Sequence, residues 1–247
     1  APYRFVFRLN PPVEEKYATV ASFMDRFMPR DRSAAVLCEE LPAAEALSEQ
    51  WLAQAATLGL DPIFRIRFLP GRIDYRPDLA KARIKKPELL VLIAAPGDAA
   101  LMLRQRRELS LTPKLILGEA PGVARSEFVD VAGEACESMC ALVPWAASAA
   151  LPGARRFSQR YFDRYGRFPG HHEALSFAAL TVVADAISRA HPAARGSIRH
   201  AMAETNLSTI CGRVRFEPKG ARPGQNKAPW LLVQWQSGRL ETIWPQD

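Results

Sequence analysis

Three acidic residues directly follow segments that we predict to be strands, and paired acids at such positions can carry out general acid–base chemistry. They are Glu39, Glu40 and Glu119. Nothing in their spacing requires a catalytic pair, and the chain has neither a nucleophile elbow nor a phosphate-binding loop. We therefore predict that the protein is not an enzyme. The functional question becomes what the best placed of these acids, Glu119, faces.

The segment from Leu89 to Glu119 determines the position of that acid. Leu89–Ala95 is continuously apolar, as expected of a strand covered on both faces, and Lys114–Leu117 is a second short buried strand. With a helix between them, the two strands should be parallel neighbours with a right-handed crossover. Both then end at the edge where open parallel sheets bind ligands. Glu119 is predicted to lie at that edge.

The cysteines and histidines give little support for a metal site. The four cysteines are Cys38, Cys136, Cys140 and Cys211. The spacing of Cys136 and Cys140 could place two thiols on one helix face, but no further ligands stand at matched spacing. His171-His172-Glu173 lacks the spacing that puts two imidazoles on one helical face. The apolar context of each cysteine favours small buried side chains. We expect no metal and no cofactor.

Length, charge and hydropathy limit the class of protein further. A chain of 247 residues allows one large domain or two small ones. The net charge of +7 is compatible with an anionic partner such as nucleic acid, but the basic residues are dispersed, which favours a solvated basic surface. No stretch approaches the roughly 20 apolar residues of a membrane span. We recognise no signal peptide, because Arg4–Leu9 already predicts a strand. A cleaved signal or a missing upstream segment would both explain this.

Up to Pro144 the chain alternates between predicted strands and helices, which predicts a doubly wound α/β sheet. The elements are a helix at Val13–Phe27, a polar turn at Pro29–Ser33, a strand at Ala34–Cys38, a helix at Pro42–Leu58, a strand at Ile63–Leu69, a helix at Asp78–Lys86, the unit around Leu89–Glu119, a helical or irregular segment at Gly122–Ala135, and a strand at Met139–Val143. In the strand Ile63–Leu69, Arg65 and Arg67 alternate with apolar residues, which favours an edge position.

The pattern changes after Pro144. We predict helices at Ala154–Tyr165, His172–Arg189 and Ala194–Thr205, a strand at Gly212–Phe216, and a hairpin of Leu231–Trp235 with Leu240–Trp244 around Ser237-Gly238. The second helix carries an apolar stripe of Leu175, Ala179, Val182 and Ala186. Amphipathic helices must cover something, and we recognise no sheet for these helices in the sequence. We therefore expect that their sheet lies upstream of Ala1, or that they cover the single sheet in another way.

Several motifs occur in an order that a known family shares. The run Phe157-x3-Tyr161-x3-Tyr165-Gly166-x2-Pro169 precedes a small-residue helix ending at Ala186-Ile187. Later motifs are Gly212-x-Val214-x-Phe216-x3-Gly220, Gln234-Trp235-x2-Gly238 and Trp244-Pro245. Three further motifs fall where the family has its own: Phe7-Arg8, Leu103-Arg104-Gln105 and Gly118-Glu119. Together they resemble the periplasmic solute-binding proteins of branched-chain amino acid ABC transporters over the whole chain.

The resemblance implies a type I periplasmic-binding fold, with one doubly wound parallel sheet lobe plus an incomplete second lobe. Residues 1–10 would form a crossover strand. Residues 11–143 and 228–247 would form the α/β ligand-binding lobe, which is the second lobe of the family. Residues 144–227 would form a mainly helical part of the first lobe. The opening βα units of that lobe would precede Ala1 and would be absent from this chain.

The resemblance also implies how a ligand is bound. Glu119 matches an acid of the family that accepts the α-ammonium of a bound amino acid, with a helix-capping or surface glutamate as the alternative. The chemistry is suitable, because a carboxylate in a partly dry cleft needs a cationic partner. His172 falls near an aromatic residue at the cleft hinge of the family, with a capping or surface histidine as the alternative.

Three further positions concern the shape of the binding wall. The family members that bind aliphatic amino acids carry tyrosines at two of these places. One corresponds to Ala43, and the other corresponds to Ala95 or Pro96. The wall would therefore be roomier and less polar, and would accept a bulkier or aromatic ligand. Asp98 would add a polar contact or, alternatively, cap the helix that follows it.

By resemblance, the protein is a periplasmic binding protein that captures an amino acid or a related small molecule by lobe closure and presents it to the membrane permease of an ABC transporter. Two alternatives remain open: a ligand-sensing receptor or regulator domain of the same fold, and a truncated fragment that does not bind. We expect no nucleic-acid partner and no membrane-spanning segment.

Overall fold

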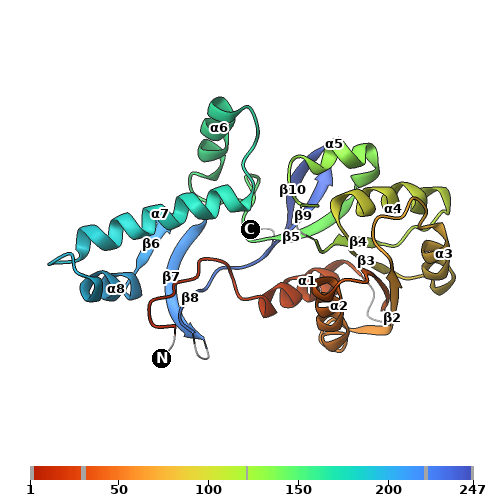
Figure 1. The fold of residues 1–247 in the computed structure, drawn as a ribbon, viewed down its shortest axis with the longest axis horizontal. Helices are drawn as coiled ribbons and strands as arrows, with labels where there is room; N and C mark the ends of the chain where they lie inside the picture. The colour runs from red at the N-terminus through yellow and green to blue at the C-terminus, as the bar shows by residue number, and fades with distance from the viewer. Residues whose placement is uncertain (1–2, 29–31, 121, 220–221, 246–247) are drawn as a thin grey trace. The chain divides into compact units, whose positions relative to one another are not determined.

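The computed structural model describes residues 3–28, 32–120, 122–219 and 222–245, which belong to two compact units (Figure 1). Tyr17–Leu142 and Leu232–Gln246 form one unit, which we call the wound-sheet unit. Ala1–Lys16 and Val143–Leu231 form the other, which we call the three-strand unit. Most of the turn predicted at Pro29–Ser33 lies outside the described residues, as does Gly220 of the closing motif.

A seven-stranded sheet forms the centre of the wound-sheet unit, in the order β10-β9-β5-β4-β3-β1-β2. Its elements are α1 (Glu14–Phe27), β1 (Arg32–Glu39), α2 (Pro42–Ala53), β2 (Leu60–Phe68), α3 (Arg76–Lys85), β3 (Leu89–Ile93), α4 (Pro96–Glu108), β4 (Leu115–Gly118), α5 (Phe128–Ala132), the 3-10 turn η1 (Gly133–Cys136), β5 (Met139–Val143), β9 (Leu231–Gln236) and β10 (Arg239–Trp244). Strands β2, β1, β3, β4 and β5 pair in parallel, and β9 and β10 form an antiparallel hairpin. These findings confirm the doubly wound α/β fold, the edge position of β2 and the closing hairpin.

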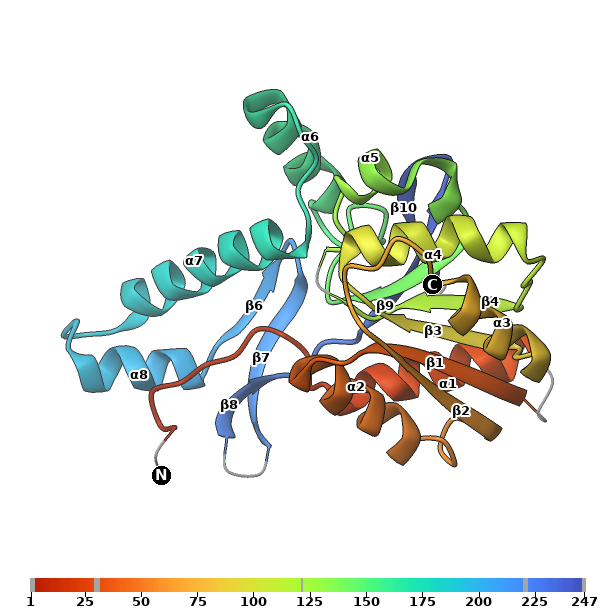
Figure 2. The same ribbon diagram turned by 45° about the vertical axis from the view of Figure 1, so that its right-hand side comes forward.

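Alternate residues of the strands pack into two separate hydrophobic clusters, one on each face of this sheet. Leu89, Val91 and Ile93 of β3 pack with α1 and α2, whereas Leu90 and Leu92 pack with α3, α4 and α5. Figure 2 shows α1 and α2 on one side of the sheet and α4 and α5 on the other. Because both faces are covered, the central strand β3 is apolar throughout rather than alternating.

The three-strand unit contains a small sheet that the sequence did not reveal. Its elements are α6 (Ala154–Tyr165), α7 (His171–Arg189), α8 (Arg195–Ala203), β6 (Asn206–Thr209), β7 (Gly212–Lys219) and β8 (Arg222–Asn226), with antiparallel strands in the order β6-β7-β8. Val182 and Ala186 of α7 pack with α8 and with Val214 and Phe216 of β7. The expectation that these helices have no sheet in the chain is therefore wrong for one face of α7.

The buried stripe of α7 differs slightly from the predicted one. It consists of Ala174, Ala178, Val182 and Ala186, while the opposite side exposes Phe177, Leu180, Val183 and Ile187. Leu180 is the most exposed of these, at 72% of its full accessible surface. The helix thus covers a sheet with a row of small residues and leaves a row of large apolar residues exposed. No helix in the described ranges has the length and apolar character that a bilayer span requires.

The predicted strand at Arg4–Leu9 is not formed. Within the described residues this segment has turns and a single bridge, in which the Arg8 amide donates to the Gly224 carbonyl at 2.8 Å. A side chain at position 224 would place its Cβ 2.6 Å from the carbonyl oxygen of Val6. Glycine is therefore required for the N-terminal segment to approach β8 so closely.

Candidate ligand-binding edge

The strand order places a topological switch point between β1 and β3, because the chain leads from β1 to β2 on one side and β3 lies on the other. Open α/β sheets bind ligands outside the carboxyl ends of the strands at such a point. Glu39 ends β1 and Ala95 follows β3 there. The amide of Ala95 donates a hydrogen bond to Oε1 of Glu39, which ties the two strand ends together.

Glu119 lies at the same edge, one residue beyond the end of β4. Leu115 and Leu117 pack on the face covered by α1 and α2, so strand alternation directs the Glu119 side chain to that face. Its carboxylate oxygen Oε1 accepts a hydrogen bond from the indole Nε1 of Trp51 at 3.3 Å. Its amide donates to the Leu92 carbonyl at 2.9 Å, which extends the pairing with β3.

Two aromatic side chains surround this carboxylate. The rings of Tyr17 and Trp51 pack edge to face, with centroids 5.3 Å apart and an interplanar angle of 83°. The Tyr17 hydroxyl donates to Oε1 of Gln50 at 3.2 Å. Burial, and secondly the Glu119 carboxylate, raise the pKa of Tyr17 above its ordinary value, so the phenol stays neutral. A half-buried carboxylate beside neutral aromatic groups is suited to contact with a cation.

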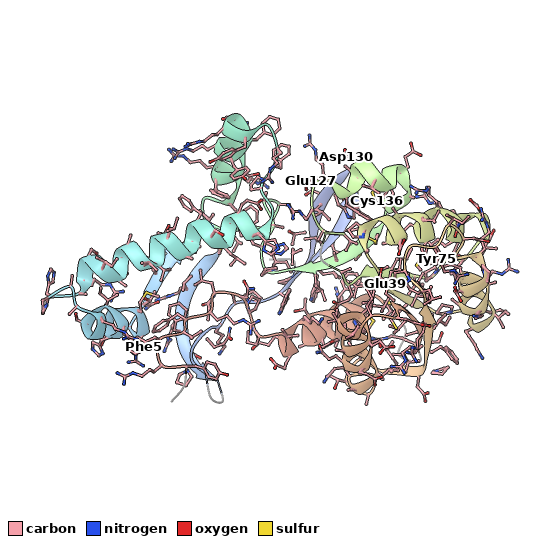
Figure 3. The ribbon with its side chains drawn as sticks, viewed as in Figure 1. Phe5, Glu39, Tyr75, Glu127, Asp130 and Cys136 are labelled. Carbon is pink, nitrogen blue, oxygen red and sulfur yellow. The ribbon has the colours of Figure 1, made fainter. Side chains whose placement is uncertain are left out.

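Glu39 points to the other face of the sheet. Ala35 and Leu37 pack with α3 and α4, and Glu39 continues their alternation with only 6% of its surface exposed. Glu39 and Tyr75 are labelled in Figure 3. Burial is the main cause that raises the pKa of Tyr75 to about 12, with the Asp98 and Glu39 carboxylates adding to it. Because Glu39 and Glu119 lie on opposite faces, they do not form an acid–base pair.

Asp98 holds a loop rather than capping its own helix. The residue before α4 is Ala95, and this helix start has no side-chain cap, so the capping alternative for Asp98 is wrong. Its Oδ2 instead accepts the amide of Gly71 at 2.8 Å. Gly71 belongs to the loop between β2 and α3. Asp98 thereby connects the start of α4 to the loop that follows the edge strand.

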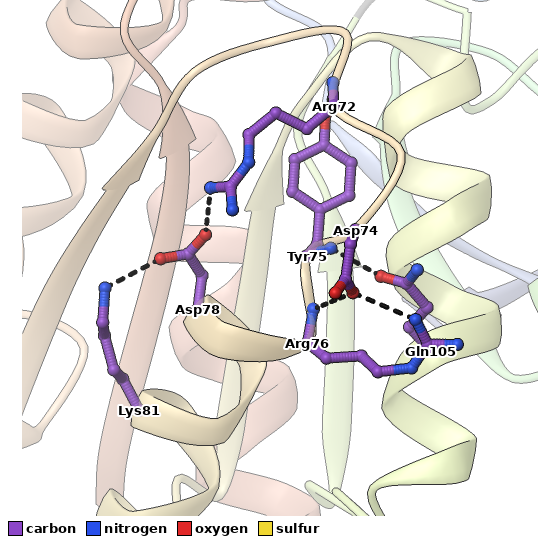
Figure 4. Close-up of polar contacts among 7 residues, drawn as sticks. All are labelled: Arg72, Asp74, Tyr75, Arg76, Asp78, Lys81 and Gln105. Atoms are coloured by element: carbon purple, nitrogen blue, oxygen red, sulfur yellow. Dashed lines mark hydrogen bonds and ion pairs between the residues drawn. The ribbon is translucent and has the colours of Figure 1, made fainter.

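Gln105 of α4 also holds this loop (Figure 4). Gln105 is 2% exposed, and its Oε1 accepts the amide of Tyr75 at 2.7 Å. Its Nε2 donates to the carbonyl of Ile73 at 3.3 Å. Buried side-chain amides that satisfy backbone groups in this way fix a loop without secondary structure of its own.

A second polar group, on α3, fixes the other side of this loop (Figure 4). Asp78 has a side chain that is only 5% exposed, and it accepts hydrogen bonds from Nη1 of Arg72 at 2.7 Å and Nζ of Lys81 at 2.9 Å. The Arg72 amide also donates to the Tyr75 hydroxyl at 3.0 Å. The contact between Arg72 and Asp78 therefore connects the loop to α3.

The predicted wall positions lie at this edge and present small side chains. Ala43 is the second residue of α2 and Ala95 precedes α4, and both are exposed. Pro96 is half-buried against Gly122, where an added Cβ would lie 2.7 Å from its Cγ and the backbone has a φ of +102°. The turn after β4 therefore approaches the turn after β3 closely, which only a glycine allows.

His172 belongs to the three-strand unit, whereas Glu119 belongs to the wound-sheet unit. It is an exposed residue in the first turn of α7, and the capping interaction there comes from Glu173, whose Oε2 accepts the Gly170 amide at 2.9 Å. His172 lines a groove of about 810 Å³ between α6 and α7, together with Arg156, Arg160, Tyr161 and Phe177. The capping alternative for His172 is thus wrong, and its side chain lies at the surface.

Cys38, Cys136 and Cys140 are buried as predicted, whereas Cys211 is only half-buried. Cys38 and Cys140 pack in the cluster beneath α1 and α2, and Cys136 packs on the opposite face. Cys136 ends η1 and Cys140 lies in β5, so these two residues do not share a helix face. Burial raises the pKa of Cys140 to about 12, which keeps the thiol protonated. In the part of the chain that the structure describes, no group of three or more potential metal ligands was found.

Comparison with known proteins identifies the family to which this α/β chain belongs. The model of the periplasmic binding protein family matches residues 1–239. The chain belongs to this family, whose members bind solutes and are not enzymes. This confirms the resemblance seen in the sequence and the prediction that the protein is not an enzyme.

Individual relatives are distant. The Leu/Ile/Val-binding protein homolog 8 of Brucella melitensis is 19% identical over 99% of this chain and 64% of its own length. A leucine-binding protein from Thermotoga maritima superposes with a TM-score of 0.78 at 23% identity, covering 97% of this chain and 67% of that one. A Leu/Ile/Val/Thr/Ala-binding protein from Brucella ovis gives 0.81 at 16%, covering 98% and 64%. The chain thus spans about 64% of the length of the curated relatives it matches.

Two aromatic residues of the edge were not predicted to be functional. Tyr17 and Trp51 both lie on the apolar helical stripes of the sequence, where they are expected in the core. One indication of a polar contact was present in the sequence: the tyrosine hydroxyl and the tryptophan indole N–H each need a hydrogen-bond partner when they are buried. The partner itself follows only from the packing of α1 and α2 against β4.

Proposed function

We propose that this protein is a solute-binding protein that captures an amino acid or a related small molecule for an ABC transporter in the periplasm, with the wound-sheet unit supplying the contact to the ammonium group. The permease of the transporter would be its protein partner. Membership of the family supports the general role, and the relatives named above carry Leu, Ile or Val in their descriptions.

The observation that supports the amino-acid assignment best is the position of Glu119. The carboxylate lies at the edge where wound sheets bind ligands, and it is half-buried beside Trp51 and Tyr17. An ammonium group offers three donors and a positive charge, which match a carboxylate in such surroundings. Ala43 and Ala95 are small, exposed side chains near the starts of α2 and α4, which favours ligands with a large apolar or aromatic side chain.

Isothermal titration calorimetry with a panel of L-amino acids tests the proposal. The panel includes leucine, isoleucine, phenylalanine and alanine. We expect binding that is strongest for the large apolar members and at least tenfold weaker in Glu119→Gln, because hydrogen bonds to charged groups contribute about 1.5–3 kcal/mol. Glu127→Gln is the matched control, since Glu127 is an exposed acid of the same unit whose side chain is 49% exposed.

Two results would contradict the proposal. If the chain bound no member of the panel, the amino-acid assignment would be wrong for this chain. If Glu119→Gln and Glu127→Gln bound with the same affinity as the unaltered protein, the ligand would not contact Glu119, even if an amino acid were captured.

A further inference from the structure

We propose that Trp51 is a positioning residue for the candidate ligand site: its indole N–H holds the Glu119 carboxylate in one orientation, so that the acceptor for the ligand is formed before the ligand arrives. The ligand part of this inference rests on the proposed function. The contact itself does not, because it lies within one unit and between side chains that the structure describes.

The first argument is the burial of the indole. Trp51 has no exposed surface, and a buried indole N–H needs an acceptor. The acceptor is Oε1 of Glu119, 68 residues away along the chain, at 3.3 Å. A carboxylate is a stronger acceptor than a neutral carbonyl. The bond therefore satisfies the tryptophan and at the same time restrains the glutamate.

The second argument is that Trp51 cannot readily turn away. Its ring is packed edge to face against Tyr17, which is 3% exposed, with centroids 5.3 Å apart. Tyr17 is fixed in turn by its hydroxyl, which donates to Gln50 at 3.2 Å. Gln50 and Trp51 are neighbours on α2, so α1 and α2 together determine the direction of the indole N–H.

The third argument concerns the cost of ligand binding. A glutamate side chain loses rotamer freedom when it is immobilised by a ligand, at a cost of roughly 0.5–1.5 kcal/mol. A carboxylate that Trp51 already restrains loses less on binding. Trp51 would thus increase affinity and favour ligands whose amine meets the carboxylate in this one orientation, without touching the ligand.

An NMR comparison tests the contact without any ligand. The chain has five tryptophans, and each gives one indole N–H resonance in a ¹H–¹⁵N spectrum. We expect the Trp51 resonance to shift in Glu119→Gln, because the substitution replaces a charged acceptor with a neutral one, and to stay in place in Glu127→Gln. If the Trp51 resonance did not move in Glu119→Gln, or moved equally in Glu127→Gln, the inference would be wrong.

Calorimetry then tests the effect on the ligand. Trp51→Phe keeps the aromatic packing and removes the donor, and we expect it to weaken binding of the best amino acid about tenfold. Trp235→Phe is the matched control: Trp235 is 1% exposed in the same unit, and its indole donates to the Val123 carbonyl at 3.0 Å instead. Equal affinities in the two variants would refute the positioning role.

The outcomes separate this inference from the proposed function. If the unaltered chain bound no amino acid, the proposed function would fail for this chain, and the NMR comparison would still decide whether Trp51 holds Glu119. If the chain bound an amino acid and Trp51→Phe bound it equally well, the function would stand and the positioning role would be wrong.

Discussion

Replacing Gln105 by methionine should release the loop between β2 and α3 without reshaping the core. Methionine has a similar size, but it cannot accept the Tyr75 amide at 2.7 Å or donate to the Ile73 carbonyl at 3.3 Å. Gln105 and Tyr75 are both almost completely buried, so water does not readily replace the lost partners. A buried donor left without an acceptor costs about 1–3 kcal/mol. We expect opening of the loop to become easier by about 2 kcal/mol.

Amide hydrogen exchange measures this locally. A change of about 2 kcal/mol corresponds to roughly 30-fold faster exchange of the Tyr75 amide, since about 1.4 kcal/mol is a factor of ten. The control is Gln236→Met, because Gln236 is exposed and its side chain donates to that of Gln234. Unchanged protection of the Tyr75 amide in Gln105→Met would refute the reasoning that Gln105 holds the loop.

Three further predictions concern other parts of the chain. Burial raises the pKa of Tyr75 to about 12, so its stabilising contribution is complete below its unfolded pKa of about 10 and is lost as the pH rises toward 12. Tyr75→Phe should reduce the loss of stability in that window, as measured by urea unfolding at several pH values. Gly224→Ala should destabilise the three-strand unit by about 1–3 kcal/mol in thermal unfolding, because its Cβ would lie 2.6 Å from the Val6 carbonyl oxygen. Leu180→Lys should change the unfolding free energy by less than about 0.5 kcal/mol, since Leu180 is 72% exposed, while binding of a hydrophobic dye to α7 decreases.

The sequence predicts the wound sheet well because its central strands are short, continuous apolar runs separated by helices. The parallel pairing of β3 and β4, the edge position of β2 and the turn at Ser237-Gly238 all followed from such local patterns, and both turn residues have positive φ values of 50° and 73°. These features are fixed by periodicity and by turn chemistry close in the chain.

The small sheet could not be predicted in the same way. β6 (Asn206–Thr209) and β8 (Arg222–Asn226) are short and polar, and β8 contains proline and glycine, so neither shows the alternation of a strand. Both become strands by pairing with β7. In contrast, Arg4–Leu9 has an apolar pattern and forms only a bridge, because Gly224 brings the backbone of β8 within reach at a single point.

The candidate site was predictable only where strand geometry determines it. The position of Glu119 at the sheet edge follows from the end of β4, and the face it points to follows from the alternation of Leu115 and Leu117. Its contact with Trp51 depends on how α2 packs, which no local pattern specifies. Asp98 stands where a helix cap is expected, yet it binds the Gly71 amide, because a loop distant in sequence competes for its carboxylate.

The central claim is that Glu119 contacts the ammonium group of the ligand, and one calorimetric comparison tests it most directly. The affinities of leucine and of 4-methylpentanoate, which is leucine without its amine, are measured with the unaltered chain and with Glu119→Gln. We predict that the unaltered chain prefers leucine by at least tenfold and that this preference disappears in Glu119→Gln. An equal preference for leucine in both proteins would contradict the claim.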